Sequence, residues 1–173
     1  PKIFGNIEIE RVTLRPVNYP FNVVPTPILE DRSLTDIWDT SVQTLKLCAH
    51  EHYEDCPWRE QSLYAFDARL QALYGYYAFK EYDFPVNSLN LLAKGLRSDG
   101  LLELCASAKI SINIPSFSLH WIISVREFLE HGGQKKMVAH HSAVVRSILD
   151  AALARLTKDG VVINSTKSEY WHF

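Results

Sequence analysis

The feature that most constrains the fold is a helical periodicity that runs from residue 33 almost to the end of the chain. In its first segment, Ile37, Val42 and Leu45 recur at a spacing that puts apolar side chains on one face of a helix. Ser33, with Asp36 three residues later, predicts the start of this helix through a capping box. Such segments joined by short loops are typical of antiparallel helical hairpins. The sequence therefore predicts a mainly α chain with five helices, at about residues 33–49, 60–79, 85–96, 116–130 and 136–156.

Two stretches depart from this periodicity. Residues 3–14 alternate between apolar and polar side chains, which predicts a strand, and four prolines follow between residues 16 and 27. Because one short strand cannot form a stable sheet alone, we expect residues 1–27 to be the end of a β-sandwich domain and a linker. Residues 28–173 would then belong to the helical domain. Residues 101–115 also alternate, which favours either a short β excursion or a loop that lines a site.

Composition excludes several classes of function. The formal net charge of −2 gives no electrostatic reason to expect nucleic acid or an anionic membrane as a partner. The odd count of three cysteines, without a Cys-x-x-Cys pair, indicates neither a disulfide framework nor a zinc site, and three unpaired thiols are the simplest reading. His140 and His141 are neighbours that point about 100° apart in a helix, so a solvated or capping role is expected for them. We expect no metal and no cofactor.

An acidic strip carries the candidate chemistry. On a helix over residues 60–79, Glu60 and Asp67 are two turns apart and lie on one flank, and Asp55 leads into that flank. Cleavage of a glycosidic bond needs one protonated carboxylic acid at the leaving oxygen and a carboxylate on the opposite face. Clustered acids raise one another's pKa, and Arg59 can offset the excess negative charge. From the residues alone, a solvated acidic helix N-terminus, favoured by the helix dipole, is the preferred interpretation.

A family resemblance favours the catalytic interpretation. The segment Asp55-Cys-Pro-Trp-Arg-Glu60 with Asp67 resembles the Asp-Cys-Pro-x-Arg-Glu…Asp motif of α-L-rhamnosidases of glycoside hydrolase family seventy-eight. The spacing of the three acids is the same. Further segments that resemble the family begin at Asp36, Thr44, Gly75, Asp99 and Pro115. Trp58 and residues 61–66 depart from the pattern, because many members carry Gln at the first position and Trp-Thr-Gly in the second segment.

The resemblance implies both architecture and roles. In this family the catalytic domain is an (α/α)6 toroid of helical hairpins that follows β-sandwich domains. Glu60 would be the general acid, Asp55 and Asp67 would hold the sugar hydroxyls, and Arg59 would accompany them. Trp171 resembles a site-lining tryptophan that stacks on sugar, whereas Trp38 and Trp121 are expected in the core. The family inverts the anomeric centre, and its catalytic base is expected after Phe173. We therefore expect this chain to be part of a longer protein and to be inactive in isolation.

The resulting hypothesis is an inverting glycosidase that releases terminal α-L-rhamnose from an oligosaccharide or glycoside. Two other classes stay open. One is another (α/α)-toroid glycosidase with a different sugar, and the other is a non-catalytic carbohydrate-binding relative. A homodimer is also left open, and nothing in the sequence indicates a compartment.

Overall fold

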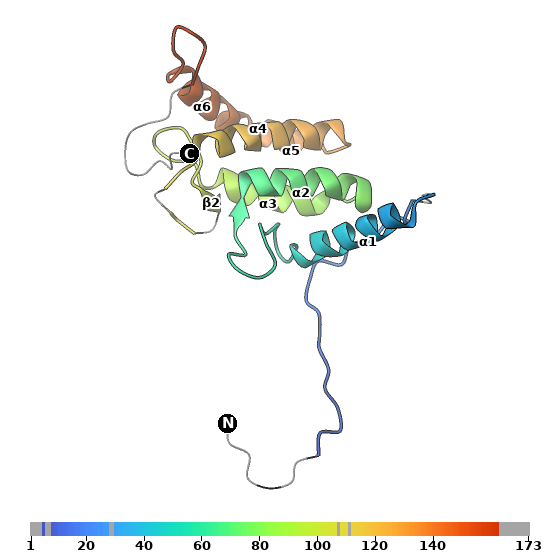
Figure 1. Ribbon diagram of the computed structural model, residues 1–173. Helices are drawn as coiled ribbons and strands as arrows, with labels where there is room; N and C mark the ends of the chain where they lie inside the picture. The colour runs from blue at the N-terminus through green and yellow to red at the C-terminus, as the bar shows by residue number, and fades with distance from the viewer. Residues whose placement is uncertain (1–4, 6–7, 28–29, 107, 111, 163–173) are drawn as a thin grey trace.

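The computed structural model describes residues 5, 8–27, 30–106, 108–110 and 112–162, and helices dominate it (Figure 1). The elements in chain order are α1 (Arg32–Leu47), β1 (Leu63–Tyr64), α2 (Ala65–Ala78), α3 (Asp83–Ala93), β2 (Cys105–Ala106), α4 (Pro115–Glu130), α5 (Lys135–His140) and α6 (Ser142–Leu153). The prediction of a mainly α chain built from helical hairpins is confirmed. None of the described helices is both long enough and apolar enough to cross a membrane.

The connections differ systematically between the two ends of the helix array. Short connections, residues 79–82 and 131–134, join α2 to α3 and α4 to α5 at one end. Long connections, residues 48–62 and 94–114, lie at the other end, where β1 and β2 also lie (Figure 1). The two strands pair antiparallel, with Leu63 opposite Ala106 and Tyr64 opposite Cys105. The β excursion expected within residues 101–115 is therefore confirmed, and it ties two long connections together.

Helix α4 lies at the centre of the packing. Its Trp121 is fully buried, and the indole Nε1–H donates to the Leu89 carbonyl of α3 at 3.1 Å. Ser118, also fully buried, accepts a hydrogen bond from the Leu102 N–H at 2.9 Å. Phe128 fills the core nearer the other end of the helix. The prediction that Trp121 is a core residue is confirmed, and Trp38 packs against the same core from α1.

Apart from Tyr76, the buried face of α2 is made of small residues. The helical spacing of Leu63, Phe66, Leu70, Leu73 and Tyr77 predicts instead a buried face of large residues. Tyr77 is exposed. Helices pack closely only where their side chains are short, and at Gly75 a Cβ would lie 2.8 Å from the Tyr53 hydroxyl. The close approach of neighbouring segments therefore decides which face of α2 is buried. Its residues are Ala65, Ala68, Ala72, Gly75, Tyr76 and Ala78.

Three predicted helix boundaries are wrong. The N-cap of α1 is Asp31, whose carboxylate accepts the Ser33 N–H at 2.8 Å and the Ser33 hydroxyl at 2.6 Å, so Ser33 lies inside the helix. The second helix begins at Ala65 instead of residue 60, because Leu63 and Tyr64 are drawn into the β1–β2 pair. The predicted fifth helix is divided at His141 into α5 and α6.

His141 is buried, so the solvated alternative of the expected role is wrong, whereas the residue does occupy the cap position between α5 and α6. Its Nε2 lies 2.9 Å from Asn90 Oδ1, an oxygen that can only accept, so Nε2 carries the proton. The ring meets Trp121 edge-on at 5.3 Å. Burial lowers the pKa of His141, which keeps the imidazole neutral in the core.

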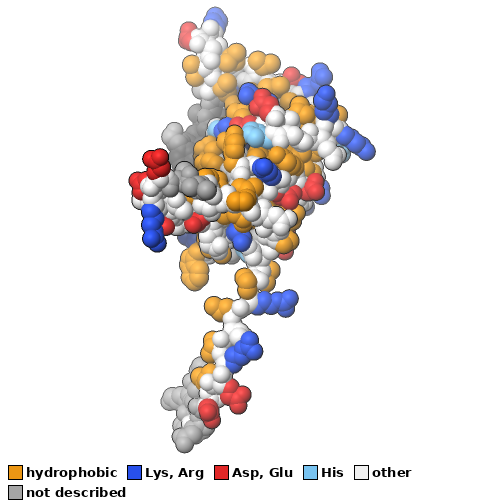
Figure 2. All heavy atoms as spheres, turned by 90° about the vertical axis from the view of Figure 1, so that its right-hand side faces the viewer, with side chains coloured by type: hydrophobic (Ala, Val, Ile, Leu, Met, Phe, Trp, Pro, Cys, Tyr) orange, Lys and Arg blue, Asp and Glu red, His pale blue; other side chains and the backbone are white. Residues whose placement is uncertain are grey.

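The N-terminal segment divides into two parts. Residues 8–17 extend away from the helices with exposed side chains, among them Ile9, Val12 and Leu14, and form no strand among the described residues (Figures 1 and 2). Tyr19 and Phe21 instead pack on the helical body, where Phe21 is buried and stacks on Phe79 at 4.1 Å. A strand requires a paired neighbour, and no described residue pairs with residues 8–14. That this segment ends a β-sandwich domain stays a prediction.

Two turns with the same geometry follow α3 and α6. In the first, the Arg97 N–H donates to the Leu101 carbonyl at 2.8 Å; in the second, Thr157 N–H donates to Val161 at 2.8 Å. Each turn carries a glycine with positive φ, Gly100 at +84° and Gly160 at +78°. These left-handed conformations disfavour any residue with a Cβ. The turns differ in their surroundings, because only Gly100 packs against α6.

We predict that Gly100→Ala destabilises the protein more than Gly160→Ala. Both substitutions cost about 1 kcal/mol for a left-handed alanine. A Cβ at residue 100 would also lie 2.9 Å from Ala151 Cβ and 3.0 Å from the Ser147 carbonyl, whereas nothing lies within 4 Å at residue 160. Overpacking adds roughly 1–3 kcal/mol. Urea unfolding of the two variants in the same protein measures the difference, and equal destabilisation would contradict the packing of this turn on α6.

Candidate active site

In the acid-bearing loop, residues 48–62, contacts between Asp55 and Ser62 close the second half into a turn. The Asp55 N–H donates to the Ser62 carbonyl at 3.0 Å, and the Ser62 N–H donates back to the Asp55 carboxylate at 2.9 Å. Further along, the Gln61 side chain donates to the Pro57 carbonyl at 3.3 Å. Gln61 itself has φ of +51°, the left-handed conformation that reverses the chain before β1. The loop is therefore a defined turn, and Asp55 helps to form it.

Glu60 lies in this loop and not on α2, so the prediction that it shares a helix face with Asp67 is wrong. Closure of the loop at Ser62 and pairing of β1 leave the backbone at residue 60 outside the helix. The Glu60 side chain is 39% exposed. Its Oε2 accepts the Tyr64 hydroxyl at 2.7 Å, and its Oε1 accepts Arg59 Nη2 at 3.0 Å. The candidate acid is therefore held at both oxygens yet remains open to solvent.

Asp67 is in the first turn of α2 and is half-buried. Burial raises the pKa of its carboxyl, and the negative charges of Asp55 and Glu60 raise it further, against a lowering by its own backbone N–H. These effects require the three acids to lie near one another. The structure thus brings together Asp55, Glu60 and Asp67, with Arg59 on Glu60, although one helix face does not carry them.

Trp171, the fifth predicted site residue, lies outside the described residues. Among the residues that the structure describes, no three His, Cys, Asp or Glu side chains are grouped so that they could hold a metal ion. The three cysteines are unpaired, as expected. Burial raises the pKa of the Cys105 thiol, and Glu103, Glu60 and Asp55 raise it further, so an uncharged sulfur borders the acids.

A cleft of about 550 Å³ lies between α1 and the middle of α2. Asp55, Gln71 and Tyr74 line one side of it, and the face of α1 from Asp36 to Thr44 lines the other. Glu60 and Asp67 do not line it. The lining by α1 was not predicted, because the amphipathic pattern of that helix identifies its packing face and says nothing of the neighbouring cleft.

Aromatic rings pack between β1, the start of α2 and α4. Phe66 is at the start of α2 and packs against two rings of α4. Its ring centroid lies 6.0 Å from that of Phe117 and 4.5 Å from that of His120. Tyr64 meets Phe117 edge-on at 6.3 Å. These rings connect the β1 residue that contacts Glu60 to the N-terminal half of α4, so the acid loop rests on packed side chains.

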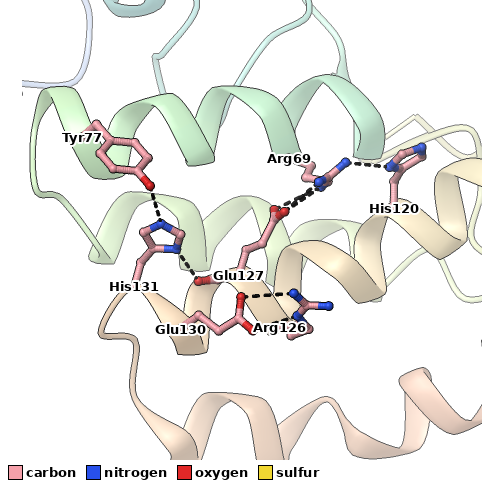
Figure 3. A network of polar contacts seen from close by, with 7 residues as sticks. All are labelled: Arg69, Tyr77, His120, Arg126, Glu127, Glu130 and His131. Atoms are coloured by element: carbon pink, nitrogen blue, oxygen red, sulfur yellow. Dashed lines mark hydrogen bonds and ion pairs between the residues drawn. The ribbon is translucent and has the colours of Figure 1, made fainter.

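A buried ion pair behind these rings was also missed from the sequence. Arg69 on α2 makes a two-pronged contact with the Glu127 carboxylate on α4, with Nη2 at 2.6 Å and Nε at 3.0 Å, and Arg69 Nη1 donates to His120 Nδ1 at 3.2 Å (Figure 3). Burial, and then the Arg69 charge, lower the pKa of His120. The pair spans 58 residues of sequence, so no local spacing could have indicated it.

Helical hairpins with an acid-bearing loop at one end define the class of protein: a glycosidase domain of the α/α-hairpin type. The model of one family, described as the bacterial alpha-L-rhamnosidase six-hairpin glycosidase domain, matches residues 29–172. The chain belongs to this family. The predicted resemblance and the predicted fold, part of an (α/α)6 toroid, are confirmed.

Two solved structures are similar to this chain. A rhamnosidase from Klebsiella oxytoca with rhamnose bound is 25% identical, with a TM-score of 0.76 over 87% of this chain and 30% of that one. A GH78 family rhamnosidase of Bacillus sp. GL1 is 28% identical, with a TM-score of 0.79 over 84% of this chain and 15% of that one. The chain therefore spans less than a third of the length of either structure. No curated protein matches it.

We predict that Glu127→Gln lowers the free energy of unfolding by about 3 kcal/mol, because it leaves the Arg69 charge buried without its partner. The two side chains are only 19% and 13% exposed. The matched control is Glu130→Gln, which breaks the neighbouring Arg126 pair on the same helix, where the side chains are 70% and 51% exposed (Figure 3). That change should cost less than about 1 kcal/mol. Denaturant unfolding of both variants decides, and similar losses would contradict a buried role for Glu127.

Proposed function

We propose that the protein carrying this chain is an inverting α-L-rhamnosidase, which hydrolyses terminal α-L-rhamnose from an oligosaccharide or glycoside. The observation that carries the proposal is the solvent-accessible Glu60 carboxyl, held by Tyr64 and Arg59 beside Asp55 and Asp67 in a chain of the rhamnosidase family. The Klebsiella relative with bound rhamnose supports the choice of sugar.

Glu60 acts as the general acid in this proposal. Its carboxylic proton passes to the glycosidic oxygen as the bond from that oxygen to the anomeric carbon breaks, and the bonding electrons leave with the oxygen. Glu60 then remains as a carboxylate. Two features support this role: the carboxyl can reach a ligand from solvent, and the Tyr64 and Arg59 donors stabilise the charge that forms on it.

Asp55 and Asp67 bind the hydroxyls of the sugar, with Arg59 next to them. Asp55 keeps one carboxylate oxygen on the Ser62 N–H, so its remaining lone pairs are available to a ligand. Asp67 has a raised pKa, caused first by burial, so it holds a proton to higher pH than an ordinary aspartic acid. The two carboxyls therefore differ in their surroundings, since Asp55 is held by a backbone N–H and Asp67 is half-buried.

An inverting reaction also needs a base that activates water on the opposite face of the sugar, at roughly 6.5–9.5 Å from the acid. The proposal assigns that role to a glutamate from a later hairpin. Within residues 1–173 no residue is assigned to it. Trp171 would add a stacking surface for the sugar.

We predict that Glu60→Gln in the full-length protein slows hydrolysis of an unactivated rhamnosyl disaccharide by roughly a hundred- to ten-thousandfold. An aryl α-L-rhamnoside with a good leaving group should lose much less, because its leaving oxygen needs little protonation. Steady-state rates on both substrates measure this.

The matched control is Asp67→Asn, which removes a sugar-holding carboxyl but leaves the acid in place. It should slow both substrates to a similar extent. Wild-type turnover of the disaccharide by Glu60→Gln would remove Glu60 from the acid role.

A further inference from the structure

Tyr64 makes the strongest contact that the candidate acid has, and the roles assigned above use it only as one of two donors that stabilise charge on Glu60. The tyrosine hydroxyl donates to Glu60 Oε2 at 2.7 Å, a charge-assisted hydrogen bond when Glu60 is ionised. The other contact, from Arg59 to Oε1, comes from a side chain that is 81% exposed and adjacent in sequence. Exposed pairs of this kind contribute little. Tyr64 therefore fixes the carboxyl more firmly than Arg59 does.

The two ends of this hydrogen bond lie on different kinds of structure. Tyr64 belongs to β1, where it pairs with Cys105, and its ring meets Phe117 of α4. Glu60 lies in the exposed part of the acid-bearing loop. The bond thus fixes a loop side chain relative to the strand pair and to α4. Burial, and then the bond to Glu60, raise the pKa of the Tyr64 phenol, so it stays protonated and can only donate to an ionised carboxylate.

We propose that Tyr64 is a positioning residue for the proton transfer, which holds Oε2 of Glu60 as an acceptor and leaves Oε1 to carry the acid proton. This inference rests on the proposed function, in which Glu60 is the acid. A carboxylic acid has one hydroxyl oxygen and one carbonyl oxygen, and a donor on Oε2 favours the carbonyl there. Arg59 can only donate, so it cannot accept the hydrogen bond of a proton on Oε1, which stays available to the leaving oxygen.

The same bond assists the reaction itself. As Glu60 releases its proton, negative charge grows on the carboxyl, and the hydrogen bond from Tyr64 strengthens. An interaction that is stronger in the transition state than in the ground state raises the rate. Because the gain depends on proton transfer, it should be largest for leaving groups that need the proton most.

Tyr64→Phe in the full-length protein tests this, because it removes one oxygen and keeps the ring against Phe117. We expect kcat on an unactivated rhamnosyl disaccharide to fall on the order of ten- to a hundredfold. With a nitrophenyl α-L-rhamnoside the loss should stay below about threefold. A purely structural role would lower both rates together.

The matched control is Tyr76→Phe on α2. The Tyr76 hydroxyl is buried and has no hydrogen-bond partner among the described residues, and its ring stacks on Tyr82 and His131 near the other end of α2. Its loss therefore removes a phenolic oxygen without touching Glu60. Both rates should stay near those of the unmodified protein. Thermal unfolding of the two variants checks that each is folded.

The pH profile supplies a second readout. The groups that face Glu60 are Arg59 and Asp55 in its loop, Tyr64 on β1, Asp67 on α2 and Cys105 on β2. Of these, Tyr64 donates to the ionised carboxylate, so its removal favours the protonated acid. The alkaline limb of kcat/KM on the disaccharide should therefore move to higher pH in Tyr64→Phe. A monofluorinated tyrosine at position 64, a stronger donor with nearly the same shape, should move that limb to lower pH.

The outcomes separate the two proposals. Equal losses on both substrates, no loss on either, or an alkaline limb that moves with neither replacement would overturn the role of Tyr64. If Glu60→Gln shows its selective loss in the same assays, the proposed function survives such a result. Wild-type turnover of the disaccharide by Glu60→Gln overturns both.

Discussion

The contact between α2 and α4 is the constraint on which the candidate site depends. Small residues on α2 allow close approach to its neighbours, and the Arg69–Glu127 pair fixes how the two helices lie along one another. At the far end, the Tyr77 hydroxyl lies 3.4 Å from His131 Nε2 (Figure 3). A polar contact at each end, with the small residues Ala72 and Gly75 between them, resists sliding of one helix along the other. Asp67 lies in the first turn of α2 and β1 directly precedes this helix, so the positions of Asp67 and Tyr64 depend on this contact.

The acid loop differs from the α2–α4 contact, because its candidate acid has to stay exposed. Glycoside hydrolysis requires a carboxyl that meets a ligand, so Glu60 cannot be buried as Glu127 is. The loop compensates through local hydrogen bonds: Asp55 and Ser62 close its second half, and a left-handed Gln61 completes the turn. Asp55 therefore has two functions, one in the turn and one proposed for the sugar. A substitution at Asp55 would disturb the position of Glu60 as well as ligand binding, which makes Asp67 the cleaner residue for separating binding from acid catalysis.

The fold class, the helical hairpins and the grouping of Asp55, Glu60 and Asp67 could be predicted, because periodicity and motif spacing are local signals. The geometry that groups the acids could not. A helix starting at residue 60 satisfies the apolar pattern, but the strand pair between Tyr64 and Cys105, which lie 41 positions apart in the numbering, competes with it and wins. The Arg69–Glu127 pair could not be predicted for the same reason, because its two residues are far apart in sequence. The burial of His141 was missed for another reason. A histidine is polar and was expected at the surface, but Asn90 accepts its N–H inside the core.

The short connections lie at one end of the helices and the long connections at the other. This separation lets the domain be stable while its long connections form a site. Hairpin turns of a few residues at one end leave little backbone to order, whereas the long segments at the other end need additional contacts to hold a shape. Here those contacts are the β1–β2 pair and the tight turn at Gly100, which packs against α6. The hydrogen bond from Tyr64 to Glu60 then fixes an exposed carboxyl relative to the paired strand β1. Through Tyr64, the candidate acid is thus positioned by Cys105 and Phe117, which are distant from it in sequence, while it stays open to a ligand.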